Sequence, residues 1–468
     1  MTAPAFENGT RIASPERSRR ARVTSAAQIV SRIINTVVRL FSIPLALSLL
    51  GREQYGIWLT LLSIITWFSV ADLGMPSALV NPLAQAIGSD EGRSAQQLVS
   101  SVVAILLAGG LALAGLVLVI APHLQLASLL GAGPDISNST VLPAVAVVVV
   151  LFLGLLGLRV ADVVALAMQR GHWAAAADIG GSVVSLAWLL ILRRHGSSLA
   201  GVAAALTCPA TAARLVLWFA IGKASGGMLV PRPAAASWSV LHRLAGDSGA
   251  FLAGSLGEVL IMQTANVVIA RVSGAGQVPA FAIPYQLFFS SFVLLTAVVA
   301  PLWPAYAEAR NAADWPWIRA ASRKAMIETL TLAALGFPLL ALLSPVLIRA
   351  WVGPDYVPQP LLVWLFVLHF IQWTWCYNWG ILITGLGFVR QRTPIQLLWG
   401  GLNVGLMIFF GRAWGLIGFA IGMCFALVLT EVWLFPLLAR ARLPELFTHA
   451  RQSRSHAESS DETRQQVP

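Results

Sequence analysis

Five polar residues recur at helical spacing in the first long apolar stretch of the chain, QIVSRIINTVVRLFSIPLALSLL, which begins at residue 28. Successive members are three or four residues apart, which places them on one face of an α-helix: Gln28, Arg32, Asn35, Arg39 and Ser42. Guanidinium groups stay protonated and bind phosphate through a rigid fork of donors. The stripe therefore predicts an anion-binding face, with phosphate as the favoured ligand.

The stretch that carries this stripe is long enough to cross a bilayer, because about 20 helical residues match the roughly 30 Å hydrocarbon layer. A charge inside such a span costs at least about 2.5 kcal/mol unless it faces a cavity or a partner. Arg32 lies about one turn from the start of the stretch, from where its side chain can also reach the cytoplasmic headgroups. Arg39 lies too deep to do so easily, and we expect it to face a polar lumen.

The composition indicates an integral membrane protein. Of 468 residues, 57% are hydrophobic and only 11% are charged, whereas soluble domains are about 25% charged. The net charge of +11 therefore does not indicate nucleic-acid binding. The three cysteines lie in apolar segments without paired spacing, so no disulfide, metal, redox site or cofactor is expected.

Twelve apolar segments have the length of a membrane span, and the polar first 27 residues are not followed by a signal-peptide pattern, so no cleaved leader is expected. If the N-terminus is cytoplasmic, most Lys and Arg residues fall in cytoplasmic segments, as the positive-inside rule requires. Both termini are then cytoplasmic. The expected spans are 28–50, 57–81, 97–120, 141–166, 173–192, 198–221, 247–270, 278–303, 325–348, 360–384, 394–411 and 414–438.

Short motifs repeat at offsets of about 220 residues. The pairs are GPD at 133–135 and 353–355, LAGVAAA at 199–205 and LIGFAIG at 416–422, and LAQA at 83–86 and YAEA at 306–309. Because three pairs in the same order are unlikely by chance, we expect a duplicated six-helix unit. The expected all-α fold has lobes at 28–221 and 247–438, related by an axis along the membrane normal. The remaining segments are a basic tail (1–27), a cytoplasmic linker (222–246) and a polar tail (439–468).

The segment LGREQYGIWLTLLSIITWFSVADLGMPSALVNPLAQA, from Leu50 to Ala86, resembles the opening of the polysaccharide transporters. These are the O-antigen and exopolysaccharide flippases of the multidrug/oligosaccharidyl-lipid/polysaccharide flippase superfamily. The match rests on LG-x-x-x-YG-x-W and on DLG. The resemblance implies a V-shaped bundle of two lobes in the bacterial inner membrane. It also implies transfer of an undecaprenyl-diphosphate-linked oligosaccharide to the outer leaflet, with a polysaccharide polymerase and chain-length machinery as partners.

The repeat and this resemblance add further candidate residues for binding a diphosphate-linked substrate. The offset of 223 residues places Glu258 opposite Asn35 and Ser255 opposite Arg32. Glu258 can pair with Arg39 across the lumen as a static ion pair, or gate the lumen by protonation. Asp72, in DLG, can take the same role or serve as a structural constraint of the family. A proton or sodium gradient, or substrate supply, would drive transport.

Two other classes of function compete with a lipid-linked oligosaccharide flippase. A multidrug exporter can use the same fold, but cationic drugs favour an acidic lumen, and the deepest stripe here is cationic. A membrane glycosyltransferase or polymerase usually places carboxylates in a long outside loop, and the longest one here, 121–140, contains only Asp135. No nucleotide-binding G-x-x-x-x-G-K-[ST] motif is present. We therefore expect a transporter and not an enzyme.

Overall fold

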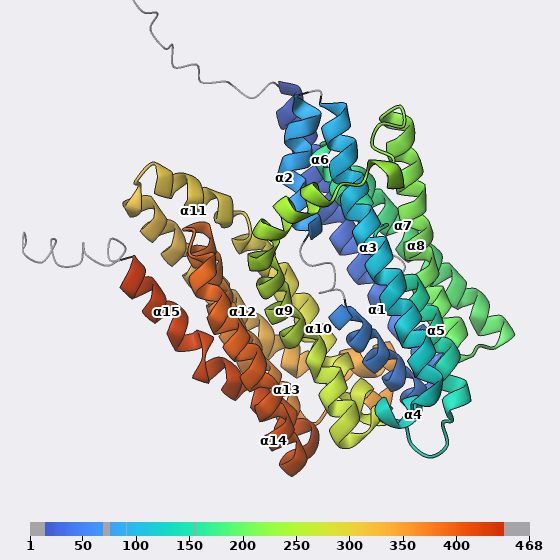
Figure 1. Cartoon of the computed structure of the whole chain (residues 1–468). Coiled ribbons are helices and arrows are strands. Elements are labelled where there is room, and N and C mark those ends of the chain that lie inside the picture. The colour runs from blue at the N-terminus through green and yellow to red at the C-terminus, as the bar shows by residue number, and fades with distance from the viewer. Residues whose placement is uncertain (1–14, 69–74, 90, 154–155, 444–468) are drawn as a thin grey trace, which may run out of the picture. The chain divides into compact units, whose positions relative to one another are not determined.

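A computed structural model describes residues 15–68, 75–89, 91–153 and 156–443 (Figure 1). Within these ranges the regular structure is helical. A few side chains inside the described helices, including those of Gln28, Ser255 and Glu258, lie outside the description. The expected all-α class is confirmed.

The N-terminal half forms helices over each of its six expected spans. α1 is continuous in hydrogen bonding, but Gly51 has left-handed backbone angles (φ 70°, ψ 176°) and divides it into two helices. Only glycine adopts such angles without strain. The helices are α1 (Pro15–Trp67), α2 (Met75–Gly88), α3 (Gly92–Ile120), α4 (Leu126–Leu129), α5 (Asn138–Leu153), α6 (Val160–Ala167), α7 (Gly171–His195) and α8 (Leu199–Ala224).

The C-terminal half repeats this order of elements. Gly415 (φ 58°, ψ −135°) divides α14 as Gly51 divides α1, and the short helix α11, which holds YAEA, corresponds to α2, which holds LAQA. The helices are α9 (Trp238–Ser273), α10 (Val278–Val299), α11 (Leu302–Asn311), α12 (Trp315–Val352), α13 (Pro360–Gly385), α14 (Val389–Leu429) and α15 (Glu431–Arg442).

Breaks in the helices explain how twelve expected spans relate to the observed elements. In the described residues, eight helical segments are long and apolar enough to cross a membrane, and three shorter apolar helices accompany them. One of the eight, Val389–Arg442, contains two expected spans. Conversely, the expected span 141–166 consists of α5 and α6, and the span 278–303 ends near Pro301, which precedes α11. Proline removes a helical hydrogen bond and so favours a break there.

The helices cluster into two compact units, which we describe separately. Unit 1 contains residues 1–45, 71–120 and 146–248, and unit 2 contains 46–70, 121–145 and 249–468. In unit 1, the linker between the halves packs on α3: the amide of Arg232 donates to Ser100 Oγ at 3.0 Å, and that of Ser237 donates to Ser101 Oγ at 2.8 Å. Both serines are buried.

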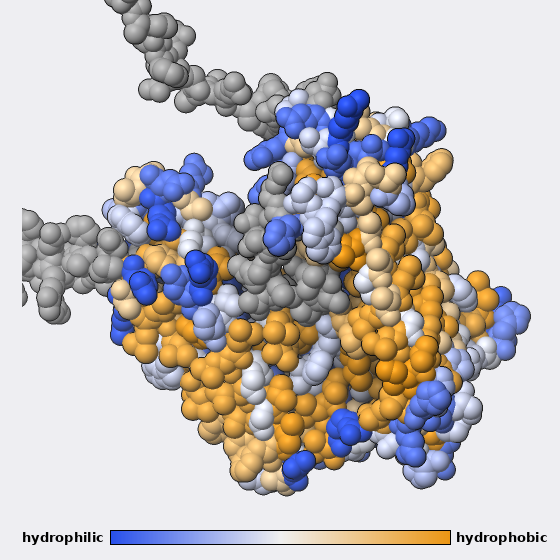
Figure 2. All heavy atoms as spheres, viewed as in Figure 1, coloured by the Kyte–Doolittle hydropathy of each residue, from blue (hydrophilic) through white to orange (hydrophobic). Residues whose placement is uncertain are grey.

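Unit 2 has a core rich in aromatic rings from α10, α12 and α13. The ring centroids of Phe281 and Phe366 are 5.1 Å apart, and those of Phe292 and Trp373 are 4.6 Å apart. Such pairs stabilise packing beyond the area they bury. On the face shown in Figure 2, hydrophobic residues cover the middle of the helices and hydrophilic residues gather near their ends, the pattern expected of helices in a bilayer. The chain is a multi-pass membrane protein.

Candidate functional site

The two arginines of the predicted stripe lie on the exposed surface of α1. Neither guanidinium has a hydrogen-bond or ion-pair partner among the described residues, and both side chains are exposed. Asn35 lies at the inner edge of the stripe, where its Nδ2 donates to Ser31 Oγ at 3.1 Å. Its Oδ1 is buried and accepts no hydrogen bond from the described residues. The stripe thus combines two exposed cations with a partly buried amide.

This part of α1 also exposes a second, apolar face. Ile33, Val37 and Phe41 are 49%, 45% and 62% exposed, and they lie about 100° to 180° around the helix from the line of Arg32 and Arg39. Hydrocarbon can cover the apolar face, but an arginine face in contact with hydrocarbon would be costly. The two exposed faces therefore have different surroundings in a membrane, and the arginine face requires water or an anion.

Four other predicted site residues fall where the structure gives no side-chain information. Asp72 lies outside the described residues, and Gln28, Ser255 and Glu258 lie in described helices but without described side chains. Their roles remain predictions, including the proposed pair of Arg39 with Glu258.

The motif that carries the family resemblance forms a structural joint inside unit 2. We use "joint" for residues 50–58 together with 128–133 and 271–277. Arg52 Nε donates to the carbonyl of Gly276 at 2.7 Å, and the Gly133 amide donates to Glu53 Oε1 at 2.5 Å. Arg271 Nη1 donates to the carbonyl of Ser128 at 3.2 Å. Backbone groups left free by the loops are thereby paired.

Close backbone contact explains two glycines of the joint. A Cβ atom on Gly56 would lie 1.9 Å from the Ala275 carbonyl oxygen, and one on Gly131 would lie 2.1 Å from the Ala270 oxygen. The Ala275 amide also donates to the Gly131 carbonyl at 2.7 Å. Tyr55 and Trp58 of the same motif are 4% exposed. LG-x-x-x-YG-x-W is therefore a packing motif.

A cluster of charged residues in unit 1 was not predicted from the sequence. Arg214 on α8 contacts Asp162 on α6, with 3.5 Å between Nε and Oδ2, and its Nη2 donates to Asp178 Oδ1 on α7. The Arg214 side chain is 14% exposed. Because these residues belong to three different helices, no spacing within one helix indicates the cluster. One guanidinium neutralised by two carboxylates is suited to joining helices in a membrane.

A buried carboxylate lies at the break between α14 and α15. Glu431 is 3% exposed, and its Oε1 accepts no hydrogen bond from the described residues. The positive charge of Arg392 on α14 acts on it, and Arg392 Nη1 also donates to Thr384 Oγ1 at 2.9 Å. The sequence repeat suggested a pair between Glu431 and Arg214, but Arg214 has its own partners within unit 1.

Comparison of the fold with solved structures defines the class of protein. The chain superimposes on the inward-facing conformation of a multidrug resistance MATE family transporter of the MOP superfamily with a TM-score of 0.75. The match covers 89% of this chain and 98% of that chain at 14% sequence identity. The chain therefore has the fold of these twelve-helix transporters.

Sequence relatives agree with the resemblance seen at Leu50–Ala86. The chain is 23% identical to a "Putative O-antigen transporter" of Salmonella typhi, over 89% of this chain and 95% of that protein. It is 20% identical to a "Putative O-antigen export protein" of Yersinia pseudotuberculosis, over 91% and 97% of the two chains. No protein-family model matches the chain. The resemblance to polysaccharide transporters is confirmed and extends over about nine-tenths of the chain.

Proposed function

We propose that this protein is a flippase that moves an undecaprenyl-diphosphate-linked oligosaccharide across the bacterial inner membrane by alternating access. The product would serve the synthesis of a surface polysaccharide such as O-antigen. The observation that carries the proposal is the exposed arginine face of α1, opposite an apolar face that hydrocarbon can cover. The named activity of the sequence relatives supports the same function.

The chemistry of the proposed site is binding and not catalysis. Arg32 and Arg39 lie seven residues, or about two turns, apart on one helix face. Two guanidinium groups at this separation can hold the two phosphates of a lipid diphosphate through bidentate hydrogen bonds. Asn35, between them, has a buried oxygen that can accept a hydrogen bond from a sugar hydroxyl.

The decisive test is the variant Arg39→Ala in cells that lack the wild-type protein. We expect loss of surface polymer and accumulation of the lipid-linked oligosaccharide, with an unchanged amount of folded protein, because the guanidinium binds a mobile diphosphate. If Arg39 instead forms a static pair with Glu258, its loss leaves a buried charge and costs about 3 to 5 kcal/mol. The double variant Arg39→Ala with Glu258→Ala would then restore both abundance and transport, which would refute the proposal.

Multidrug export is the competing function because the solved structure with the same fold belongs to a multidrug transporter. The same cells separate the two functions. An exporter predicts that deletion of the protein increases drug sensitivity while leaving surface polymer intact, and the flippase predicts the reverse.

The proposal also places both termini in the cytoplasm. Single cysteines at Ser137 and Ser237, in a background without Cys208, Cys376 and Cys424, should react with an impermeant thiol reagent from opposite sides of the membrane. Reaction of both from one side would contradict the proposed topology.

A further inference from the structure

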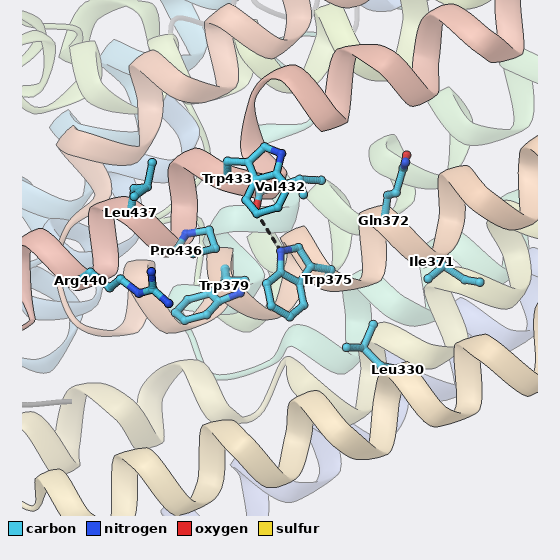
Figure 3. A pocket seen from close by; sticks show the side chains of 10 residues that line it. All are labelled: Leu330, Ile371, Gln372, Trp375, Trp379, Val432, Trp433, Pro436, Leu437 and Arg440. Carbon is cyan, nitrogen blue, oxygen red and sulfur yellow. Dashed lines mark hydrogen bonds between the residues drawn. The ribbon is translucent and has the colours of Figure 1, made fainter. Parts of the chain in front are cut away.

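A groove runs along α12, α13 and α15 within unit 2. Its volume is about 600 Å³, and apolar side chains form most of its lining, among them Trp375, Trp379, Trp433 and Leu437. Figure 3 shows Trp375 and Trp379 on α13 beside Trp433 and Leu437 on α15, with Arg440 next to the Trp379 ring. The groove is therefore apolar along its length and has a cation at one end.

The break between α14 and α15 creates this groove. Thr430 has non-helical backbone angles (φ −125°, ψ −98°). The carbonyl of Val432 beyond it accepts a hydrogen bond from Trp375 Nε1 at 3.1 Å. Trp379 Nε1, in contrast, is buried and has no hydrogen-bond partner among the described residues. An indole N–H without a partner is costly in an apolar site, and it is available to a ligand oxygen.

A second, smaller cavity adjoins the groove at its basic end. It has a volume of about 290 Å³ and shares Trp375 and Trp379 with the groove. Its polar lining comes from the first turns of α12, with Arg319, Ser322 and Arg323, and from Asn378 on α13. The two cavities together therefore place three guanidinium groups around the end of one apolar channel.

The length of the groove matches one leaflet of a membrane. Leu330, in its lining, follows Arg319 by eleven residues of α12, which corresponds to about 16 Å of helix. Half of a hydrocarbon layer is about 15 Å thick. The basic end, where α12 begins and α15 ends, is cytoplasmic in the proposed topology, because Lys and Arg gather on that side.

We infer that this groove binds the polyprenyl diphosphate carrier of the substrate in the cytoplasmic leaflet, before the substrate reaches the α1 stripe. The inference rests on the proposed function and names a second binding site for the same lipid. The first isoprene units lie against the indole rings of the groove, and the phosphates contact Arg323 and Arg440. Three guanidinium groups match the several charges of a diphosphate better than the single charge of a glycerophospholipid phosphate.

The test is photo-crosslinking of the full-length protein in lipid nanodiscs. A benzophenone amino acid replaces Leu437 in the groove, or, as a control, the exposed Leu342 of α12 outside it. The probe is radiolabelled undecaprenyl diphosphate. We expect labelling at position 437 and not at 342, with competition by unlabelled undecaprenyl diphosphate and not by equimolar phosphatidylglycerol. Equal competition by phosphatidylglycerol, or no labelling at 437, would overturn the inference.

A charge-removal pair tests the role of the basic end. The double variant Arg323→Gln with Arg440→Gln should reduce labelling at position 437 about tenfold, as expected for the loss of charge-assisted hydrogen bonds. Arg349→Gln, at the opposite end of α12, should leave it unchanged. Labelling that survives the double variant would contradict the assigned phosphate contacts. Since crosslinking measures binding without transport, it stays informative even if Arg39→Ala refutes the flippase.

Discussion

The two parts of α1 on either side of its middle differ in how their polar residues are used. Near Gly51, the residues of the joint are buried or bonded: Glu53 accepts from the Gly133 amide, and Gly56 contacts the Ala275 backbone. In the preceding turns, Arg32 and Arg39 are exposed and have no partner among the described residues. The segment that resembles known transporters thus encodes packing, whereas the residues suited to chemistry lie outside that motif.

The largest effect that this comparison predicts is on Gly56. In Gly56→Val, the side chain must separate the helix from the Ala275 backbone, where a Cβ would lie only 1.9 Å from the carbonyl oxygen. We expect a loss of stability of more than about 3 kcal/mol, measured as the melting temperature of the purified protein and its amount in the membrane. The control is Gly109→Val on α3, where nothing lies within 4 Å of the added Cβ. Equal behaviour of the two variants would show that the joint is not tightly packed.

A second prediction compares a bonded arginine with an exposed one. Arg214→Met leaves Asp162 and Asp178 without their partner. Because both carboxylates are about one-third exposed, we expect a cost of about 2 to 3 kcal/mol, below that of a fully buried pair. Adding Asp162→Asn and Asp178→Asn should recover the melting temperature. Failure to recover would mean that Arg214 stabilises unit 1 through contacts other than these ion pairs.

The exposed arginine should respond to chemistry instead of to packing. In Arg39→Lys the charge remains, but a point charge cannot reproduce the bidentate fork. We expect transport to fall about tenfold, measured as surface polymer formed per unit time, with an unchanged melting temperature. Full activity with lysine would show that only the charge matters at this position.

The smallest predicted effect is at Glu53 of the joint. Glu53→Gln retains an acceptor for the Gly133 amide but removes its charge, so the hydrogen bond weakens without being lost. Since charged and neutral hydrogen bonds differ by about 1 kcal/mol, the melting temperature should fall by only a few degrees. Glu53→Ala, which removes the acceptor, should cost more. If glutamine costs as much as alanine, the charge of Glu53 is essential to the joint.

Much of the fold was predictable because its causes are local in the sequence. Apolar length identifies the spans, and the repeated motifs identify the duplication, which the matching positions of α2 and α11 bear out. The spacing of Arg32 and Arg39 alone placed them on one helix face. Glycine and proline explain several breaks, but their positions did not predict which breaks would form, since both residues are common throughout the apolar segments.

The amino-acid sequence by itself determined the class of the protein, the order of its helices and the positions of its unusual charges, because each depends on hydropathy and on spacing within one helix. Only the tertiary structure decided which residues meet. Arg214 finds its partners on α6 and α7, Gly56 contacts a backbone more than two hundred residues away, and the tryptophans of α13 form a groove only because α15 begins beside them. Such contacts depend on how helices pack, which no periodicity along a single helix records.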